Sequence, residues 1–404
     1  MAKKNLWVLY FSVFLVMAGF GITLPVFPFY TERVASLGGT SARGLALQVG
    51  LLTSVYVLMQ FVFAPLWGKR SDRMGRKPLI LIGVAGYGVG QILFGLSTSL
   101  FMLYGARVIG GILSAALLPA AGSYVADMTG EKERATGMAW LGTMTSLGVV
   151  VGPSLGGLLT RNDLHFSARY GHFMLDRFSV PFFAAGGLAF ASLPVVLRGV
   201  RESLHSPHAS VPKPGLVLTW GDVAKKIRPL LALTFISQFG LATYAATFAL
   251  YAQQTLNYGP PRVGTAFTMC GVVMAVSQVG AVSFLTKRYG ERYLVALGFV
   301  LMGAGLFFLL AAQELKWVLS AIGVMALGVA FIAPNLLALI SKVGSEQTGA
   351  ALGLQGAATS LGETVGPLFG TILFSWRADA PFLLTGIMLV AVGLLSVRRN
   401  WAGA

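Results

Sequence analysis

The chain has 404 residues, of which 55% are hydrophobic and only 11% are charged, and its formal net charge is +16. A soluble globular protein carries about 25% charged residues, so this composition excludes a soluble globule and predicts a chain embedded in lipid. The sequence contains no Walker motif and no nucleophile or acid–base constellation, so we expect neither ATP hydrolysis nor another enzymatic activity.

Twelve apolar runs follow one another along the chain, and a membrane-spanning helix needs about 20 such residues. The predicted spans are 6–29, 45–67, 79–97, 100–126, 136–160, 181–198, 229–254, 263–286, 293–312, 317–341, 348–375 and 381–397. Strands of a β-barrel would be shorter and would alternate in polarity. The predicted fold is therefore an all-α integral membrane protein.

A polar, proline-containing stretch over 199–228 separates the sixth run from the seventh. We interpret it as a cytoplasmic linker between two six-helix bundles, 1–198 and 229–404. With both termini inside, the cytoplasmic segments hold 21 Lys and Arg residues and the external segments hold eight. This asymmetry follows the positive-inside rule, so the positive charge indicates membrane topology and we expect no nucleic-acid partner.

One sixteen-residue segment occurs twice, at 142–157 and at 356–371, with nine identical positions at an offset of 214. The identical pairs are Gly142/Gly356, Thr145/Thr359, Ser146/Ser360, Leu147/Leu361, Gly148/Gly362, Val151/Val365, Gly152/Gly366, Pro153/Pro367 and Gly156/Gly370. Both copies lie in apolar runs, so the two bundles are expected to be pseudo-symmetric. Such internal symmetry is typical of secondary transporters. Proline removes a helix hydrogen bond, so we expect a bend at each Gly-Pro pair.

The loop after the second run reads Gly68-Lys69-Arg70-Ser71-Asp72-Arg73-Met74-Gly75-Arg76-Lys77-Pro78. A sharp turn between two helices would explain both Gly68 and Gly75. Basic residues at this boundary are expected from topology alone, but the acidic Asp72 is not.

This loop resembles the signature of the major facilitator superfamily, with Arg70 in place of the usual Leu. Leu103, Arg107 and Gly111 resemble the superfamily's pattern in the fourth helix, with Gly110 where Gln is usual. The run from Gly148 to Gly157 resembles its antiporter signature. Together these motifs make the chain similar to twelve-helix drug:proton antiporters, the bacterial tetracycline and multidrug efflux proteins of the cell inner membrane.

The resemblance implies roles for individual residues. Asp72 would face the start of the 348–375 span, and Arg76 would form an ion pair with Asp127. The remaining residues implied in gating come from the loop signature and from the two repeated Gly-Pro helices: Gly68, Arg73, Gly75, Lys77, Gly152, Pro153, Gly156, Gly366 and Pro367. Many relatives carry an acid in the first span, but here the first acid is Glu32, which we interpret with Arg33 as a solvated boundary pair.

Two charged residues lie in the interior of predicted spans, away from their ends, where charge is costly and usually functional. Arg107 matches the family pattern, and its alternative role is a structural donor to backbone carbonyls. Glu363 occupies the position of Val149 in the first copy of the repeat, so the scaffold needs no carboxylate there. We predict that Glu363 carries the coupled proton, with Arg107 and Asp127 assisting. The alternative is a permanently neutral, hydrogen-bonded acid.

Polar, aromatic and methionine side chains in mid-span are candidates for a substrate cavity, because methionine and aromatic surfaces adapt to varied shapes. They are Tyr56, Met59, Gln60, Gln238, Phe239, Tyr244, Asn335 and Gln355. The predicted function is proton-coupled export of lipophilic drug-like compounds. The alternatives are an exporter of one metabolite, sugar or lipid, and a proton-independent facilitator.

Metal-ligand and disulfide patterns are weak in this sequence. Cys270 is the single cysteine, and the four histidines, His165, His172, His205 and His208, lie in predicted loops without a cysteine or carboxylate cluster. We therefore expect no metal and no cofactor. The expected partners are a small-molecule substrate, protons and membrane lipid, and the expected state is a monomer. The 161–180 insertion is interpreted as a solvated loop.

Overall fold

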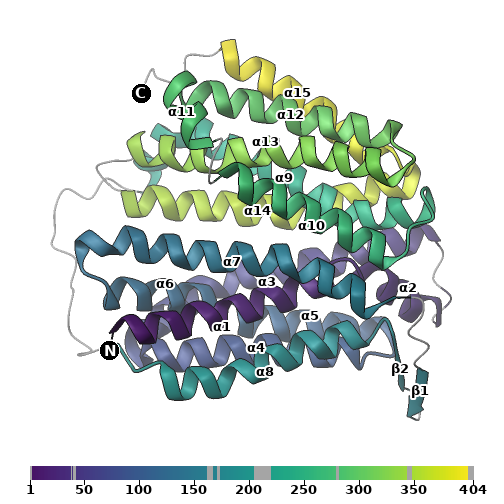
Figure 1. Cartoon of the computed structure of the whole chain (residues 1–404), viewed down its shortest axis with the longest axis horizontal. Helices are drawn as coiled ribbons and strands as arrows, with labels where there is room; N and C mark the ends of the chain where they lie inside the picture. Colours follow the sequence, from purple (N-terminus) through teal and green to yellow (C-terminus); the bar gives the residue numbers. More distant parts are fainter. Residues whose placement is uncertain are drawn as a thin grey trace. The chain divides into compact units, whose positions relative to one another are not determined.

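The computed structural model describes residues 2–37, 39, 42–161, 167–170, 173–203, 220–278, 282–343 and 348–398. Figure 1 shows helices throughout these ranges and one short β-hairpin. The first half contains α1 Ala2–Thr23, α2 Phe27–Leu37, α3 Ala42–Met74, α4 Arg76–Gly95, α5 Leu100–Ser114, α6 Leu117–Met128, α7 Glu131–Leu159, β1 Ser167–Tyr170, β2 Phe173–Asp176 and α8 Val180–Gly199. The second half contains α9 Trp220–Gln254, α10 Pro260–Ser277, α11 Ser283–Tyr289, α12 Glu291–Ala311, α13 Leu315–Val343, α14 Thr348–Trp376 and α15 Ala380–Arg398.

The described parts of the predicted apolar runs are almost entirely helical. Within the described residues, nine helical segments are long and apolar enough to cross a membrane. Large hydrophobic side chains face outward, including Phe101, which is 86% exposed, and Trp376, which is 75% exposed. Apolar outer surfaces of this kind are suited to contact with lipid. The helical backbone is suited to lipid as well, because its polar groups form hydrogen bonds within the helix.

Two of the predicted single spans are wrong in detail, because each consists of two helices separated by a turn. The 6–29 run breaks over residues 24–26, and the 100–126 run breaks at Ala115 and Ala116. Proline has no backbone N–H and cannot bond to the carbonyl four residues earlier. Pro25 and Pro28 interrupt the first run, and Pro119, in the first turn of α6, leaves the Ala115 carbonyl without its helical donor.

The insertion over 161–180 is not a simple solvated loop, which corrects the prediction. Strands β1 and β2 pair antiparallel, with Ser167 opposite Asp176. Asp176 forms an ion pair with Arg33 of α2. The Arg33 guanidinium also lies 4.5 Å from the centroid of the Tyr30 ring. The interpretation of Arg33 as part of a solvated pair with Glu32 is therefore wrong, because the hairpin is attached to α2.

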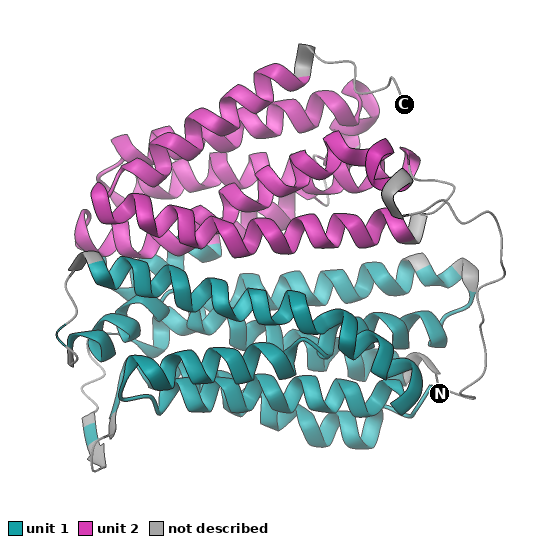
Figure 2. Cartoon of the chain, turned by 180° about the vertical axis from the view of Figure 1, so that it is seen from behind, with its two compact units in different colours: residues 1–211, 258–268 teal, residues 212–257, 269–404 magenta. Residues whose placement is uncertain are grey.

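Two compact units make up the chain, coloured separately in Figure 2. One contains residues 1–211 and 258–268, and the other contains 212–257 and 269–404. Most of the predicted linker, residues 204–219, lies outside the described ranges. Its last part is helical, because α9 begins at Trp220 and not at the predicted residue 229.

The same three helix pairings occur in both halves of the chain. In the first half α1 packs on α7, α4 on α5, and α4 on α8. In the second half α9 packs on α14, α12 on α13, and α12 on α15. These are the first and fifth, third and fourth, and third and sixth predicted spans of each half. The repeat found in the sequence is therefore also a repeat of helix packing.

Candidate functional site

The turn between α3 and α4 depends on one glycine, Gly75. Its φ of 98° and ψ of 162° belong to a region that essentially only glycine adopts. A Cβ atom at residue 75 would also lie 2.5 Å from Oε2 of Glu202. The prediction of a turn at Gly68 is wrong, because α3 continues through Gly68 to Met74 and a Cβ atom there would meet nothing within 4 Å.

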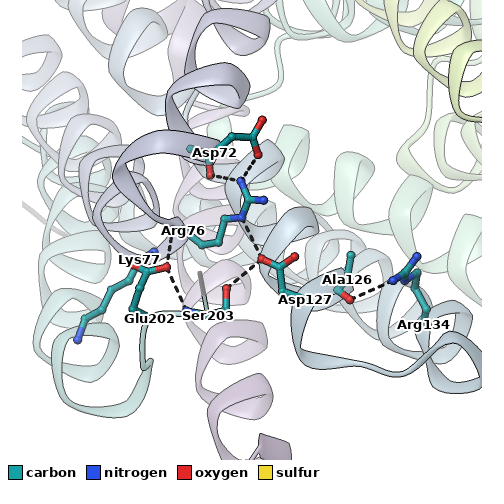
Figure 3. A network of polar contacts seen from close by, with 9 residues as sticks. Asp72, Arg76, Lys77, Ala126, Asp127, Arg134, Glu202 and Ser203 are labelled. Atoms are coloured by element: carbon teal, nitrogen blue, oxygen red, sulfur yellow. Dashed lines mark hydrogen bonds and ion pairs between the residues drawn. The ribbon is translucent and has the colours of Figure 1, made fainter. Parts of the chain in front are cut away.

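Arg76, directly after this turn, is the centre of a network of polar contacts (Figure 3). Its Nε donates to Oδ2 of Asp127 at 3.0 Å, and its Nη1 donates to Oδ1 of Asp72 at 2.6 Å. Nη1 also donates to the Ser71 hydroxyl at 3.1 Å. The ion pair expected between Arg76 and Asp127 is thus present. Because the Arg76 side chain is only 10% exposed, these acceptors stabilise a charge that is largely removed from water.

Residues after α8 complete the network. Glu202 accepts from the backbone N–H of Arg76 at 2.8 Å and of Lys77 at 3.2 Å, so its carboxylate caps the first turn of α4. Ser203 donates from its hydroxyl to Oδ2 of Asp127 at 3.1 Å. The Lys77 ammonium donates to the Leu197 carbonyl at 2.8 Å, while Arg73 is exposed. The segment after α8, which contains Glu202 and Ser203, is therefore hydrogen-bonded to the α3–α4 turn and to Asp127.

A counterpart of this turn lies between α11 and α12. Gly290 has a φ of 84° and a ψ of 156°, close to the values at Gly75. The next residue, Glu291, forms an ion pair with Lys342 at the end of α13. Arg76 and Asp127 occupy the matching positions, 215 residues earlier, with the charges reversed. The α11–α12 turn cannot be recognised from the sequence as a second copy of the α3–α4 turn, because its charges and most of its residues differ from those of the first.

Substitution of the two loop glycines separates their roles. Gly75→Ala is expected to lower the melting temperature of the purified protein in detergent, because a non-glycine residue in this backbone region costs about 1–3 kcal/mol and the new methyl group meets Glu202. Gly68→Ala is the matched control and should leave the melting temperature unchanged or raise it, since alanine favours a helix. Equal changes in the two variants would contradict a special role for Gly75.

Substitution of the two corresponding ion pairs tests their unequal burial. Asp127→Asn is expected to cost about 1–2 kcal/mol, because it weakens the contacts to a buried guanidinium. Lys342→Gln should cost at most about 1 kcal/mol, because Lys342 is 64% exposed. Chemical denaturation of both variants beside the parent protein measures the difference. A larger loss in Lys342→Gln would overturn this ranking.

Repeated glycines bring two pairs of helices into close contact. On α7, a Cβ atom at Gly152 would lie 2.5 Å from the Cα of Gly21, and one at Gly156 would lie 2.9 Å from the carbonyl carbon of Ile22. On α14, a Cβ atom at Gly366 would lie 2.6 Å from the carbonyl oxygen of Phe239 on α9. Pro153 and Pro367 lie inside their helices, as predicted. Close glycine contacts of this kind are how helices associate in membranes.

Arg107 lies on the inner side of α5 and is 8% exposed. Tyr56 on α3 is close to it, with its ring centroid 5.2 Å from the guanidinium carbon. The hydroxyl groups of Tyr56 and Ser114 are 3.0 Å apart, and Gln60 donates from Nε2 to the Ser114 hydroxyl at 3.1 Å. Met59 packs beside them against Gly111. The structure thus brings Tyr56, Met59, Gln60 and Arg107 together.

The cavity candidates of the second half lie on α9, α13 and α14. Gln238 and Phe239 of α9 pack against α14 at Gly362 and Gly366. Tyr244 is 1% exposed and lies 5.2 Å from the ring of Phe248. Asn335 accepts from the Thr286 hydroxyl and donates to the Phe331 carbonyl, a pattern typical of helix packing. Gln355 lies partly buried on α14.

Glu363 is also on α14, partly exposed, between Gly362 and Thr364. Among the described residues, no cation lies within ion-pair distance of its carboxylate. Sequence reasoning missed Glu202 and Ser203. Glu202, like Asp72, is an acid that follows basic residues in the sequence, and this signal could have identified it.

The apolar helices and the repeated helix pairings define an integral membrane transporter built from two related halves. The sequence profile of the Major Facilitator Superfamily matches residues 9–232 and 230–400. The chain therefore belongs to the Major Facilitator Superfamily, and it is a multi-pass transporter of the cell membrane. The predicted family and location are confirmed.

Relatives match the chain from end to end. Multidrug resistance protein 2 of Bacillus subtilis (strain 168) is 28% identical over 100% of this chain and 98% of its own length. Quinolone resistance protein NorA of Staphylococcus aureus (strain COL) is 27% identical over 98% of this chain and 97% of its own length.

Solved structures share the fold. The human organic anion transporter MFSD10 (TETRAN) has a TM-score of 0.69 at 22% identity, over 98% of this chain and 99% of that chain. The peptide transporter POT in complex with sulfate has a TM-score of 0.79 at 14% identity, over 98% of this chain and 94% of that chain. At these identities the likeness concerns the fold alone.

Proposed function

We propose that this chain is a proton-coupled antiporter that exports lipophilic drug-like compounds by alternating access. The observation that carries the proposal is the end-to-end similarity to relatives named for multidrug and quinolone resistance. The absence of a Walker motif from the sequence favours an ion gradient as the energy source.

The proposed topology has twelve spans in two six-helix bundles, 1–198 and 229–404, joined by the 199–228 linker, with both termini in the cytoplasm. The repeated helix pairings support two equivalent bundles. Lys and Arg are in excess in the terminal segments and in those that follow an even-numbered span. This excess supports an orientation in which these segments are cytoplasmic. The working unit is proposed to be a monomer.

In the proposed cycle, Glu363 takes a proton from outside and releases it inside, and substrate moves in the opposite direction. A carboxyl group is costly inside the bilayer when it is ionised, so its protonation state can bias which side of the transporter is open. The Arg76 network would stabilise one of these states. The ion pair between Arg76 and Asp72 would form and break at a modest energetic cost because Asp72 is 67% exposed.

Transport of ethidium into proteoliposomes tests the function. The vesicles contain DNA, so that ethidium fluoresces on entry, and their lumen is made more acidic than the medium. An antiporter should exchange luminal protons for external dye. Dye uptake that does not depend on the pH gradient would instead identify a facilitator. An absence of uptake would favour an exporter of a dedicated metabolite, sugar or lipid.

A further inference from the structure

Aromatic rings from three helices surround the guanidinium of Arg107. Its Cζ atom lies 4.3 Å from the ring centroid of Phe27 on α2, 4.4 Å from that of Phe94 on α4, and 5.2 Å from that of Tyr56 on α3. The faces of these rings attract a cation. They do not replace the hydrogen bonds that its N–H groups make in water.

Part of the hydrogen-bonding capacity of Arg107 is left unused. A guanidinium has five N–H donors, yet the buried Nε atom of Arg107 has no partner. Among the residues that the structure describes, no carboxylate lies within ion-pair distance of it. Arg76, by contrast, donates to Asp127, Asp72 and Ser71. An unpaired buried charge is strongly unfavourable.

The rings beside Arg107 are fixed by packing. A Cβ atom on Gly111 would lie 2.8 Å from the backbone oxygen of Tyr56, so α3 and α5 meet closely at this point. The Tyr56 hydroxyl is engaged with Ser114, which also accepts from Gln60. Gln60 and Met59 are partly exposed. The cationic site is therefore built from ordered side chains and lies next to the surface of its own helix bundle.

We propose that Arg107 binds the carboxylate of an aromatic amphiphilic substrate. A guanidinium matches a carboxylate with two parallel hydrogen bonds. One positive charge neutralises a monoanion, whereas a dianion would leave a buried negative charge. The rings of Phe27, Phe94 and Tyr56 favour an aromatic group attached to that carboxylate. The inference rests on the proposed export of drug-like compounds and adds that monocarboxylates and zwitterions are among them.

Two fluorescent probes with the same aromatic group test this inference: pyrenebutyrate and its alcohol, pyrenebutanol. Binding of each to the purified full-length protein in detergent is measured by fluorescence anisotropy at neutral pH. The parent protein should bind the acid at least about tenfold more tightly than the alcohol. Arg107→Gln should remove this preference while it leaves the affinity for the alcohol unchanged. Arg107→Lys, which keeps the charge without the planar fork, should retain part of it.

Arg377→Gln is the matched control. Arg377 lies outside the spans and forms an ion pair with Asp379 at 2.6 Å, so its loss removes one positive charge without touching the site. The preference for the acid should survive in this variant. Equal binding of acid and alcohol by the parent protein, a preference that persists in Arg107→Gln, or no binding of either probe would each overturn the inference. The parent-protein comparison does not depend on how well the variants fold.

The ethidium assay separates this result from the proposed function. Gradient-driven ethidium uptake without a preference for pyrenebutyrate would overturn the carboxylate site and leave the antiporter proposal standing. A preference for pyrenebutyrate without gradient-driven uptake would support the site and overturn the proposed export of drug-like compounds such as ethidium.

Discussion

Glu363→Gln is expected to reduce gradient-driven ethidium uptake to the level of protein-free vesicles while the protein remains folded. Glutamine keeps the size and polarity of the side chain but cannot gain and lose a proton. The first copy of the repeat has Val149 at this position, so the helix does not need a carboxylate for its packing. The tight contacts with α9 are made by the neighbouring glycines, Gly362 and Gly366.

The control for this variant is Glu291→Gln. Glu291 is also an acid of the second half, but it lies at the start of α12 and pairs with the exposed Lys342. Its substitution should leave gradient-driven uptake nearly unchanged. Coupling that is unaffected in Glu363→Gln would remove Glu363 from the mechanism. Loss of coupling in both variants would indicate a general loss of function.

The positions of the helices could be predicted from the sequence because a long apolar run has few alternatives to a helix in lipid. The turns inside two of the runs were not predicted, although Pro25, Pro28 and Pro119 are visible in the sequence. Pro153 and Pro367 lie inside continuous helices, so the missing N–H of proline does not by itself tell which prolines end a helix.

Contacts within the site were predictable only where a family pattern connects distant residues. The Arg76–Asp127 pair was predicted in this way. Glu202 caps α4 across 126 residues of chain, and no local pattern encodes that contact. The rings around Arg107 come from α2, α3 and α4, so their convergence depends on tertiary packing. The position of the site could be identified from the sequence because Arg107 is a charged residue in a span. The residues that surround Arg107 could be identified only from the structure.

Gly156→Ala is expected to lower the melting temperature of the protein in detergent and to reduce ethidium uptake. The new methyl group would overlap the Ile22 carbonyl oxygen of α1 and lie 2.9 Å from its carbonyl carbon. These are backbone atoms, which cannot rotate away, so α1 and α7 must separate. Overpacking of this kind costs about 1–3 kcal/mol, and helix propensity returns at most about 1 kcal/mol.

Two other glycines of the repeat provide matched controls for Gly156→Ala. Gly142 lies on the same helix, but a Cβ atom there would meet nothing within 4 Å, so Gly142→Ala should raise the melting temperature slightly or leave it unchanged. Gly370, the counterpart of Gly156 on α14, faces a methyl group of Thr243 at 2.9 Å. A side chain can shift more easily than a backbone, so Gly370→Ala should have an intermediate effect. If all three variants melt at the same temperature, close backbone contact is not what the repeated glycines provide. We expect the melting temperature to fall least in Gly142→Ala, more in Gly370→Ala and most in Gly156→Ala. This order would show that the repeated glycines provide close backbone contact, and that the α1–α7 contact is tighter than the α9–α14 contact.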